Sequence, residues 1–248
     1  MQSNLKEKES HFMKIEMHAH CQPISRCAHH EPELLPAFFH EKGIGAIVLT
    51  NHCYPHHCDP LSPDPAEQAR IYVDVYHRCK AAGEPLGVKV FFGAEVKLIN
   101  EPNYPEFLLY GLSEKDFLES YPLYTRTQEE LFDFCNQKNI VMVQAHPYRT
   151  EQGYAPADMR YVHGIEVYNP HPCFDSRIAD ALRLAEENGK LMTSGSDFHV
   201  NMQAGVAGMI VPDDIGDQFM LRDYLRTGEA VIFDQNGVLD LDSVRSKA

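Results

Sequence analysis

Apolar positions along the chain follow two patterns, short apolar runs and longer amphipathic stretches. The short runs predict strands, and the continuous run IGAIVLT at 44–50 is typical of a strand buried on both faces. The predicted strands lie at 14–17, 44–50, 88–95, 106–112, 140–145, 164–168, 191–195, 207–212 and 230–234. The predicted helices lie at 31–42, 64–82, 128–139, 175–188 and 214–227. Thr127, with Glu130 three residues later, predicts a capping box at the start of the third helix.

Strands and helices alternate along most of the chain, which is typical of βα units and predicts a parallel sheet. Because an α/β barrel takes about 250 residues, a chain of 248 residues favours a single-domain α/β fold, a distorted (β/α)7 TIM-like barrel. We expect residues 1–13 to form an N-terminal extension and residues 14–248 to form the barrel. The proline- and histidine-rich stretch at 53–65 predicts an insertion within this domain.

Composition narrows the classes of partner and compartment. The formal net charge of −14 opposes binding to nucleic-acid phosphates, so no nucleic-acid polymer is expected as a partner. No apolar run approaches the length of about 20 residues that a membrane helix needs, and we expect no signal peptide from the polar stretch at 1–12. We therefore expect a cytoplasmic protein in which the seven cysteines are reduced thiols. The oligomeric state is left open.

Histidine is abundant, with 14 residues, and many of these follow the predicted strands directly. The carboxyl ends of barrel strands form the rim where active sites lie. A His-x-His pair directs both imidazoles to the same side of a strand, where one cation can bind both. The candidate ligands at strand ends are His18, His20, His52, Glu95, His146, Asp197 and His199. This pattern predicts a metal centre at the rim.

Six short motifs carry a resemblance to a known family. They are MHAH (17–20), VLTNH (48–52), FFGAEV (91–96), QAHPYR (144–149), IEVYN (165–169) and SGSDFH (194–199). In order and spacing the chain resembles the PHP (polymerase and histidinol phosphatase) superfamily. The resemblance implies a distorted (β/α)7 barrel that hydrolyses phosphate esters with two or three divalent metal ions. Mixed histidine and carboxylate ligands suit zinc, manganese and iron alike.

The resemblance also implies a ligand set. Carried over by position, it assigns His18, His20, Glu95 and Asp197 to one ion, His146 to a second that Glu95 bridges, and His52 and His199 to a third. Two cations of this kind share a bridging hydroxide, which is the expected nucleophile. His52 and His199 are also the expected catalytic proton donors to the leaving oxygen wherever they are not fully metal-bound.

The chain departs from the family pattern at three places. Asn51 stands where many members have aspartate, and Arg26 lies near the place of a further histidine. No histidine lies between Glu95 and His146, where Glu106 or Tyr110 is nearest. These departures leave open whether two or three ions bind. The candidate replacement ligands are His171, His56 and His57, and a small zinc site formed by Cys53, His56, His57 and Cys58 is an alternative.

Arginine suits phosphate because its planar fork binds two oxygens. Arg149 is the first candidate for such a clamp, and we expect it to reach over the metals without contacting them. Arg26 and Arg177 are further candidates.

The preferred function is hydrolysis of a small phosphomonoester or phosphodiester, with histidinol phosphate as one specific alternative. A metallohydrolase that cleaves C–N bonds and a non-catalytic metal-binding barrel are alternatives from other classes. The first would be supported by a carboxylated lysine at a strand end, and Lys97 and Lys190 are not expected to lie in the right place.

Overall fold

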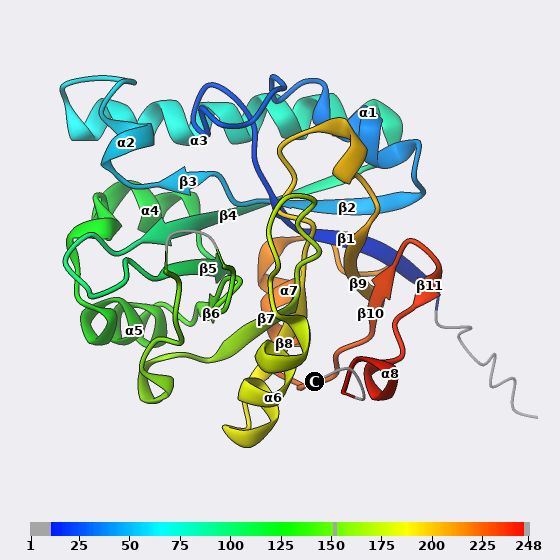
Figure 1. Ribbon diagram of the computed structural model, residues 1–248. Helices are drawn as coiled ribbons and strands as arrows, with labels where there is room; N and C mark the ends of the chain where they lie inside the picture. Colours follow the sequence, from blue (N-terminus) through cyan, green and yellow to red (C-terminus); the bar gives the residue numbers. More distant parts are fainter. Residues whose placement is uncertain (1–10, 151–152, 246–248) are drawn as a thin grey trace, which may run out of the picture.

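The computed structural model describes residues 11–150 and 153–245, which form one curled mixed sheet with helices around it (Figure 1). The strands are β1 (Phe12–Ala19), β2 (Ile44–Leu49), β3 (His52–Cys53), β4 (Lys89–Lys97), β5 (Glu106–Tyr110), β6 (Val141–Gln144), β7 (Gly164–Tyr168), β8 (Leu191–Ser194), β9 (Ala207–Pro212), β10 (Ile232–Asp234) and β11 (Gly237–Val238). The α-helices are α1 (Leu35–His40), α2 (Pro55–Cys58), α3 (Pro65–Gly83), α4 (Glu114–Ser120), α5 (Gln128–Gln137), α6 (Ile178–Glu187), α7 (Gln218–Leu225) and α8 (Leu241–Arg245).

Each predicted strand and helix has a counterpart in this list. Three short helices, α2, α4 and α8, and two strands of two residues, β3 and β11, were not predicted. The capping box is confirmed, because the Thr127 side chain accepts from the Glu130 amide and the Glu130 carboxylate accepts from the Thr127 amide. β1 begins at Phe12, inside the expected extension, and residues 1–10 lie outside the described part of the chain.

The expected parallel sheet is wrong for several strands. The strand order is β11-β10-β9-β1-β2-β4-β5-β6-β7-β8, with β3 paired to β4. β5 is antiparallel to β4 and to β6, and β9 is antiparallel to β1 and to β10. One reason is local: the connection 98–105 between β4 and β5 contains no helix and is too short for a parallel crossover. The single-domain α/β fold is confirmed with a curled mixed sheet, whereas the seven-unit count of the expected distorted (β/α)7 barrel is not.

The segment after β8 pairs with the end of β1, so candidate ligands from the first and last motifs lie next to each other. The Phe198 amide donates to the His18 carbonyl at 3.0 Å, and the His20 amide donates to the Phe198 carbonyl at 3.0 Å. These hydrogen bonds form a parallel bridge between Ala19 and Phe198. The two segments 18–20 and 197–199, far apart in sequence, consequently lie side by side.

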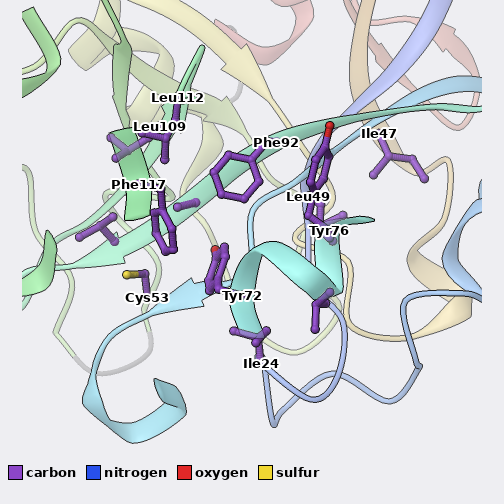
Figure 2. Packing of buried hydrophobic residues seen from close by; sticks show 14 of the residues in the cluster. Ile24, Ile47, Leu49, Cys53, Tyr72, Tyr76, Phe92, Leu109, Leu112 and Phe117 are labelled. Carbon is purple, nitrogen blue, oxygen red and sulfur yellow. The ribbon is translucent and has the colours of Figure 1, made fainter. Parts of the chain in front are cut away.

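Helix α3 covers the first half of the sheet with aromatic side chains (Figure 2). Asp64 caps its N-terminus by accepting from the Ala66 amide, and Pro65 occupies its first turn. Tyr76 packs on Phe92 of β4, with ring centroids 5.1 Å apart. This packing anchors β4, whose carboxyl end carries Glu95. No helix in the described residues is both long and apolar enough to cross a bilayer.

Gly195, directly after β8, lies close against His18 of β1, and it supports a first prediction. A Cβ atom at this position would lie 2.4 Å from the His18 Cβ and 2.9 Å from the His18 amide nitrogen. We expect Gly195→Ala to lower the free energy of unfolding by about 1–3 kcal/mol, as other overpacking substitutions do, in urea titrations with chelator present.

Gly216→Ala is the matched control, because its Cβ would meet atoms only at 3.8 and 3.9 Å. Its free energy of unfolding should stay within about 0.5 kcal/mol of the parent value. Equal stabilities for the two variants would show that β8 is not packed against β1 in this way.

Candidate metal centre

His18 and His20, at the end of β1, are each held by a hydrogen bond to Nδ1. His18 Nδ1 lies 2.9 Å from Glu166 Oε1, and His20 Nδ1 lies 3.1 Å from Ser25 Oγ. A carboxylate only accepts hydrogen bonds, so the proton of neutral His18 is on Nδ1. The Nε2 atoms of both rings are buried and without a hydrogen-bond partner. Each ring therefore presents a lone pair to the same interior space.

Ser25 fixes the tautomer of His20 through a small network. The Ser25 hydroxyl donates to Asn51 Oδ1 at 2.9 Å and accepts from the His52 amide at 3.0 Å. Its single proton is thus committed, and it can only accept from His20 Nδ1. Asn51, which departs from the family pattern, accepts at the same oxygen from the Cys21 amide at 2.7 Å. Its role here is to hold this loop.

Two buried carboxylates face the histidine lone pairs. Glu95 Oε1 lies 3.2 Å from both His18 Nε2 and His146 Nε2, and Glu95 Oε2 lies 2.6 Å from His52 Nδ1. Asp197 Oδ1 lies 3.0 Å from His20 Nε2. Lone pairs and carboxylate oxygens at this spacing repel one another unless a positive charge lies between them. Ligand atoms around one small divalent cation are similarly about 3 Å apart.

The pKa shifts of His18 and Glu95 also show that positive charge is favoured between these groups. Burial favours the neutral ring of His18, yet the carboxylates of Glu166, Asp197 and Glu95 hold its pKa well above the ordinary value. Burial also favours a neutral Glu95, but His18 and His52 keep its pKa well below the ordinary value.

All seven predicted ligands converge in this region. Five groups have ligand atoms within 4.8 Å of one another: His18–His20–Asp197, His18–Glu95–His146, His52–Glu95–Glu106, His20–His52–His199 and Cys27–His52–His57. His146 and Asp197 adopt left-handed backbone conformations, with φ of 27° and 53°. Such conformations are uncommon for residues other than glycine and gather at functional sites.

Glu106, one of the two residues named for the gap between Glu95 and His146, lies within the cluster. Its Oε2 lies 3.6 Å from His146 Nε2, and its Oε1 lies 3.1 Å from Lys97 Nζ. Lys97 therefore does lie at the site, contrary to expectation, because β4 continues to residue 97. Its amine is ion-paired and also lies 3.4 Å from the Tyr154 hydroxyl.

Of the three candidate arginines, two reach the site. Arg149 is buried and donates from Nη2 to Asp197 Oδ2 at 2.7 Å and to Asn169 Oδ1 at 2.9 Å. It thus contacts a predicted metal ligand directly, and does not simply reach over the metals. Arg26 is exposed and lines the cavity. Arg177 lies outside the cavity wall, where it pairs with Asp180 at 2.6 Å.

The candidate replacement ligands divide in the same way. His171 and His56 line the cavity. His57 also lines it, but both of its ring nitrogens have partners, since Nδ1 accepts from the Arg26 amide and Nε2 lies 2.9 Å from the Tyr54 hydroxyl. The residues of the alternative zinc site do not converge: Cys53 (Figure 2) and Cys58 belong to the buried core, whereas His56 is exposed. Its four residues form no metal-binding group among the described residues.

Three further residues of this region were missed by sequence reasoning. Glu166 orients His18, and its Oε2 accepts from the His146 amide at 3.1 Å. Glu16 accepts from the His18 amide and from Ser196, and burial raises its pKa to about 7. The sequence did carry a signal for Glu16 and Glu166, since each is an acidic residue within an apolar strand. Glu16 also lies two residues before His18, on the same face of the strand. Cys27 carries no such signal.

Cys27 lies against the histidines at the cavity wall. Its Sγ is 3.1 Å from His199 Nε2. Burial opposes ionisation of the thiol, but hydrogen bonds with His199 and His52 lower its pKa to about 6.

The cluster lies beside a cavity of about 800 Å³. Its walls include the cationic side chains of Arg26, Lys97 and Arg149 and the aromatic rings of Tyr54, Tyr154 and Phe174. A cavity of this size accommodates a small organic molecule. Cations on its walls suit an anionic substrate.

Solved structures share this fold at low sequence identity. A two-domain protein from Bacteroides vulgatus, containing a predicted PHP-like metal-dependent phosphoesterase, matches with a TM-score of 0.70 and 18% identity over 96% of this chain and 70% of that chain. PsfC from Pseudomonas syringae matches with a TM-score of 0.61 and 18% identity over 95% and 94% of the two chains. At these identities the likeness shows a shared fold.

A third similar structure is the lesion-specific endonuclease PfuEndoQ from Pyrococcus furiosus, with a TM-score of 0.54 and 14% identity over 88% of this chain and 56% of that chain. Endonuclease Q also matches as a complex with a 27-mer duplex substrate. The net charge had led us to expect no nucleic-acid partner. The similarity of the fold to these proteins means that the fold does not support that exclusion. No protein-family model matches the sequence, and no curated protein sequence matches it.

Glu166 supports a second prediction. Glu166→Gln keeps the size of the side chain but replaces one carboxylate oxygen by an NH2 group, which only donates. The variant therefore cannot accept both from His18 Nδ1 and from the His146 amide through its two terminal atoms. We expect metal affinity to fall by about 10- to 100-fold, the usual effect of losing a residue that orients a ligand. Competition with a chromogenic chelator measures this affinity.

Glu119→Gln, on the exposed end of α4, is the control and should bind metal as the parent does. Unchanged affinity in Glu166→Gln would show that His18 needs no such anchor.

Proposed function

We propose that this chain is a metal-dependent hydrolase of phosphate esters, of the PHP type. The observation that carries the proposal is the cluster of inward-facing imidazoles and carboxylates beside a cavity with cationic walls. The shared fold with PHP-like phosphoesterases supports the same conclusion.

The residues fit divalent metal ions. Unpartnered buried ligand atoms on His18, His20, His52, Glu95 and Asp197 lie within a few ångströms of one another, which is costly without a cation. His18, His20, Glu95 and Asp197 would hold one ion, and Glu95, His146 and Glu106 would hold a second. When bound, such ions activate water as a nucleophile and neutralise charge on the phosphoryl oxygens. Mixed imidazole and carboxylate ligands suit zinc, manganese and iron alike.

The chain's own cations bind and orient the phosphate. Arg149 is held by Asp197 and Asn169, so its guanidinium is already oriented before substrate arrives. Its Nε has no partner. Lys97 and Arg26 add positive charge to the cavity wall, where Lys97 is ion-paired with Glu106 and Arg26 is exposed. A rigid buried arginine and an exposed one suit a small phosphate ester that must enter and leave.

His52 and His199 have two possible roles, proton donor and metal ligand, and a single ring nitrogen cannot perform both. The contacts of His199 with Cys27 favour metal binding for this pair. Arg149 and Lys97 are then the groups left to assist the leaving oxygen.

The substrate class we propose is a small phosphomonoester or phosphodiester, because the net charge of −14 opposes long polyanions. The similarity to endonuclease Q supports a second candidate, a damaged DNA strand. A panel with p-nitrophenyl phosphate, bis-p-nitrophenyl phosphate, histidinol phosphate and an abasic duplex separates these possibilities. Hydrolysis of the duplex alone would overturn the small-molecule proposal.

Asp197 supports a third prediction. Asp197→Asn should lower hydrolysis of p-nitrophenyl phosphate or its bis-ester by about 100-fold or more, because even residues behind the ligands cost 10- to 100-fold. Circular dichroism should show an unchanged fold. Asp223→Asn, an exposed carboxylate on α7, is the control and should keep full activity. If Asp197→Asn retains more than about a tenth of the turnover at saturating metal, a loss of only about 1.4 kcal/mol, Asp197 is not a ligand.

Arg26 supports a fourth prediction. Arg26→Ala should raise the inhibition constant of inorganic phosphate by roughly tenfold, since a charge-assisted contact contributes about 1.5 kcal/mol at the lower end of its range. Arg177→Ala is a matched control, because that arginine pairs with Asp180 outside the cavity. Metal content should be unchanged in both. Equal inhibition constants in the two variants would remove Arg26 from the phosphate site.

A further inference from the structure

Cys27 forms part of a ligand-like cluster at the cavity wall, which borders the carboxylates through His52. Its Sγ is 3.1 Å from His199 Nε2, and its sulfur and a ring nitrogen of His52 lie within 4.8 Å of each other. Sulfur and nitrogen ligands of one tetrahedral zinc ion are roughly 3.5 Å apart. The observed positions need only small adjustments to reach that spacing.

The tautomer of His199 is fixed by the backbone. His199 Nδ1 lies 2.8 Å from the Asp197 carbonyl oxygen, which can only accept a hydrogen bond. The proton of the neutral ring is therefore on Nδ1, and the Nε2 lone pair points at the Cys27 sulfur. A thiol proton or a metal ion can occupy the space between them.

The rings of His52 and His20 add a reason for positive charge here, which they share with the carboxylates. His52 is 8% exposed, and its Nδ1 makes no hydrogen bond of normal geometry, although Glu95 Oε2 lies 2.6 Å away. His20 is fully buried, and its Nε2 has no hydrogen-bond partner. Ligand atoms of His20, His52 and His199 lie within 4.8 Å of one another. Buried nitrogens in this state are costly unless an ion satisfies them.

His57 is near the same cluster but is not a ligand. The Arg26 amide donates to its Nδ1 at 3.0 Å, so the proton of the neutral ring lies on Nε2, next to the Tyr54 hydroxyl. Burial and the neighbouring His52 lower the pKa of His57 to about 3, which keeps the ring neutral. His57 therefore serves to hold the Arg26–Cys27 segment in place.

We propose that the Cys27 thiolate, together with His52 and His199, binds a divalent metal ion at the cavity wall, and that this position selects zinc over manganese and magnesium. The thiol proton passes to solvent when the ion binds. Thiolate favours zinc, whereas carboxylates also accept manganese and magnesium. The inference rests on the metal centre of the proposed function but not on any substrate.

Cobalt substitution tests the ligand assignment without measuring activity. The protein loaded with Co²⁺ should show a near-ultraviolet thiolate-to-cobalt charge-transfer band. Cys27→Ser should lose this band, and Cys173→Ser, which removes the other exposed cysteine, should keep it. No band in the parent protein, or a band that persists in Cys27→Ser, would overturn the proposal.

Metal content and thiol reactivity give a second measurement. Zinc-loaded Cys27→Ala should contain about one equivalent less zinc than the parent, and Cys27→His should restore it without the charge-transfer band. Zinc should protect Cys27 from a thiol reagent in Cys173→Ser, while excess manganese should not. Equal reactivity with and without zinc would overturn the proposal.

These results stand apart from hydrolysis. A cobalt–thiolate band in a protein that hydrolyses no phosphate ester would refute the proposed function and leave the Cys27 site intact. Hydrolysis of a phosphate ester without such a band would support the proposed function and refute the Cys27 site.

Discussion

The hydrogen bonds that fix the Nδ1 protons of the buried imidazoles are the interactions on which the rest of the site depends. Glu166 holds His18, Ser25 holds His20, and the Asp197 carbonyl holds His199. In each case the partner can only accept, so every ring turns its other nitrogen toward the common space. Without these partners the rings could rotate or exchange tautomers, and a set of convergent lone pairs would not persist.

The fold supplies these partners from distant parts of the chain. Glu166 comes from β7, Ser25 from the loop after β1, and Asp197 from the segment after β8, which pairs with β1 through Phe198. The sheet must curl for this pairing to form. Its antiparallel strands do not disturb the chemistry, because the ligand-bearing ends of β1, β4, β6 and β8 still meet beside the same cavity.

The sequence predicted which side chains gather beside the cavity because they obey a simple rule, a polar residue directly after an apolar run. That rule located His18, Glu95, His146 and Asp197. It could not predict strand direction, since β5 has the same apolar pattern whether it runs parallel or antiparallel. It also could not place side chains that act across strands: the contact of Arg149 with Asp197 and that of Cys27 with His199 join residues far apart in sequence.

The left-handed backbones of His146 and Asp197 have a consequence for the protein's abundance in the cell. Each such conformation costs about 1–3 kcal/mol, a considerable fraction of the net stability of an ordinary domain. A ligand that binds only the folded state offsets this cost in proportion to the logarithm of its concentration. The steady-state amount of folded protein should then follow metal supply, because chains made during metal scarcity would unfold more often and be degraded sooner.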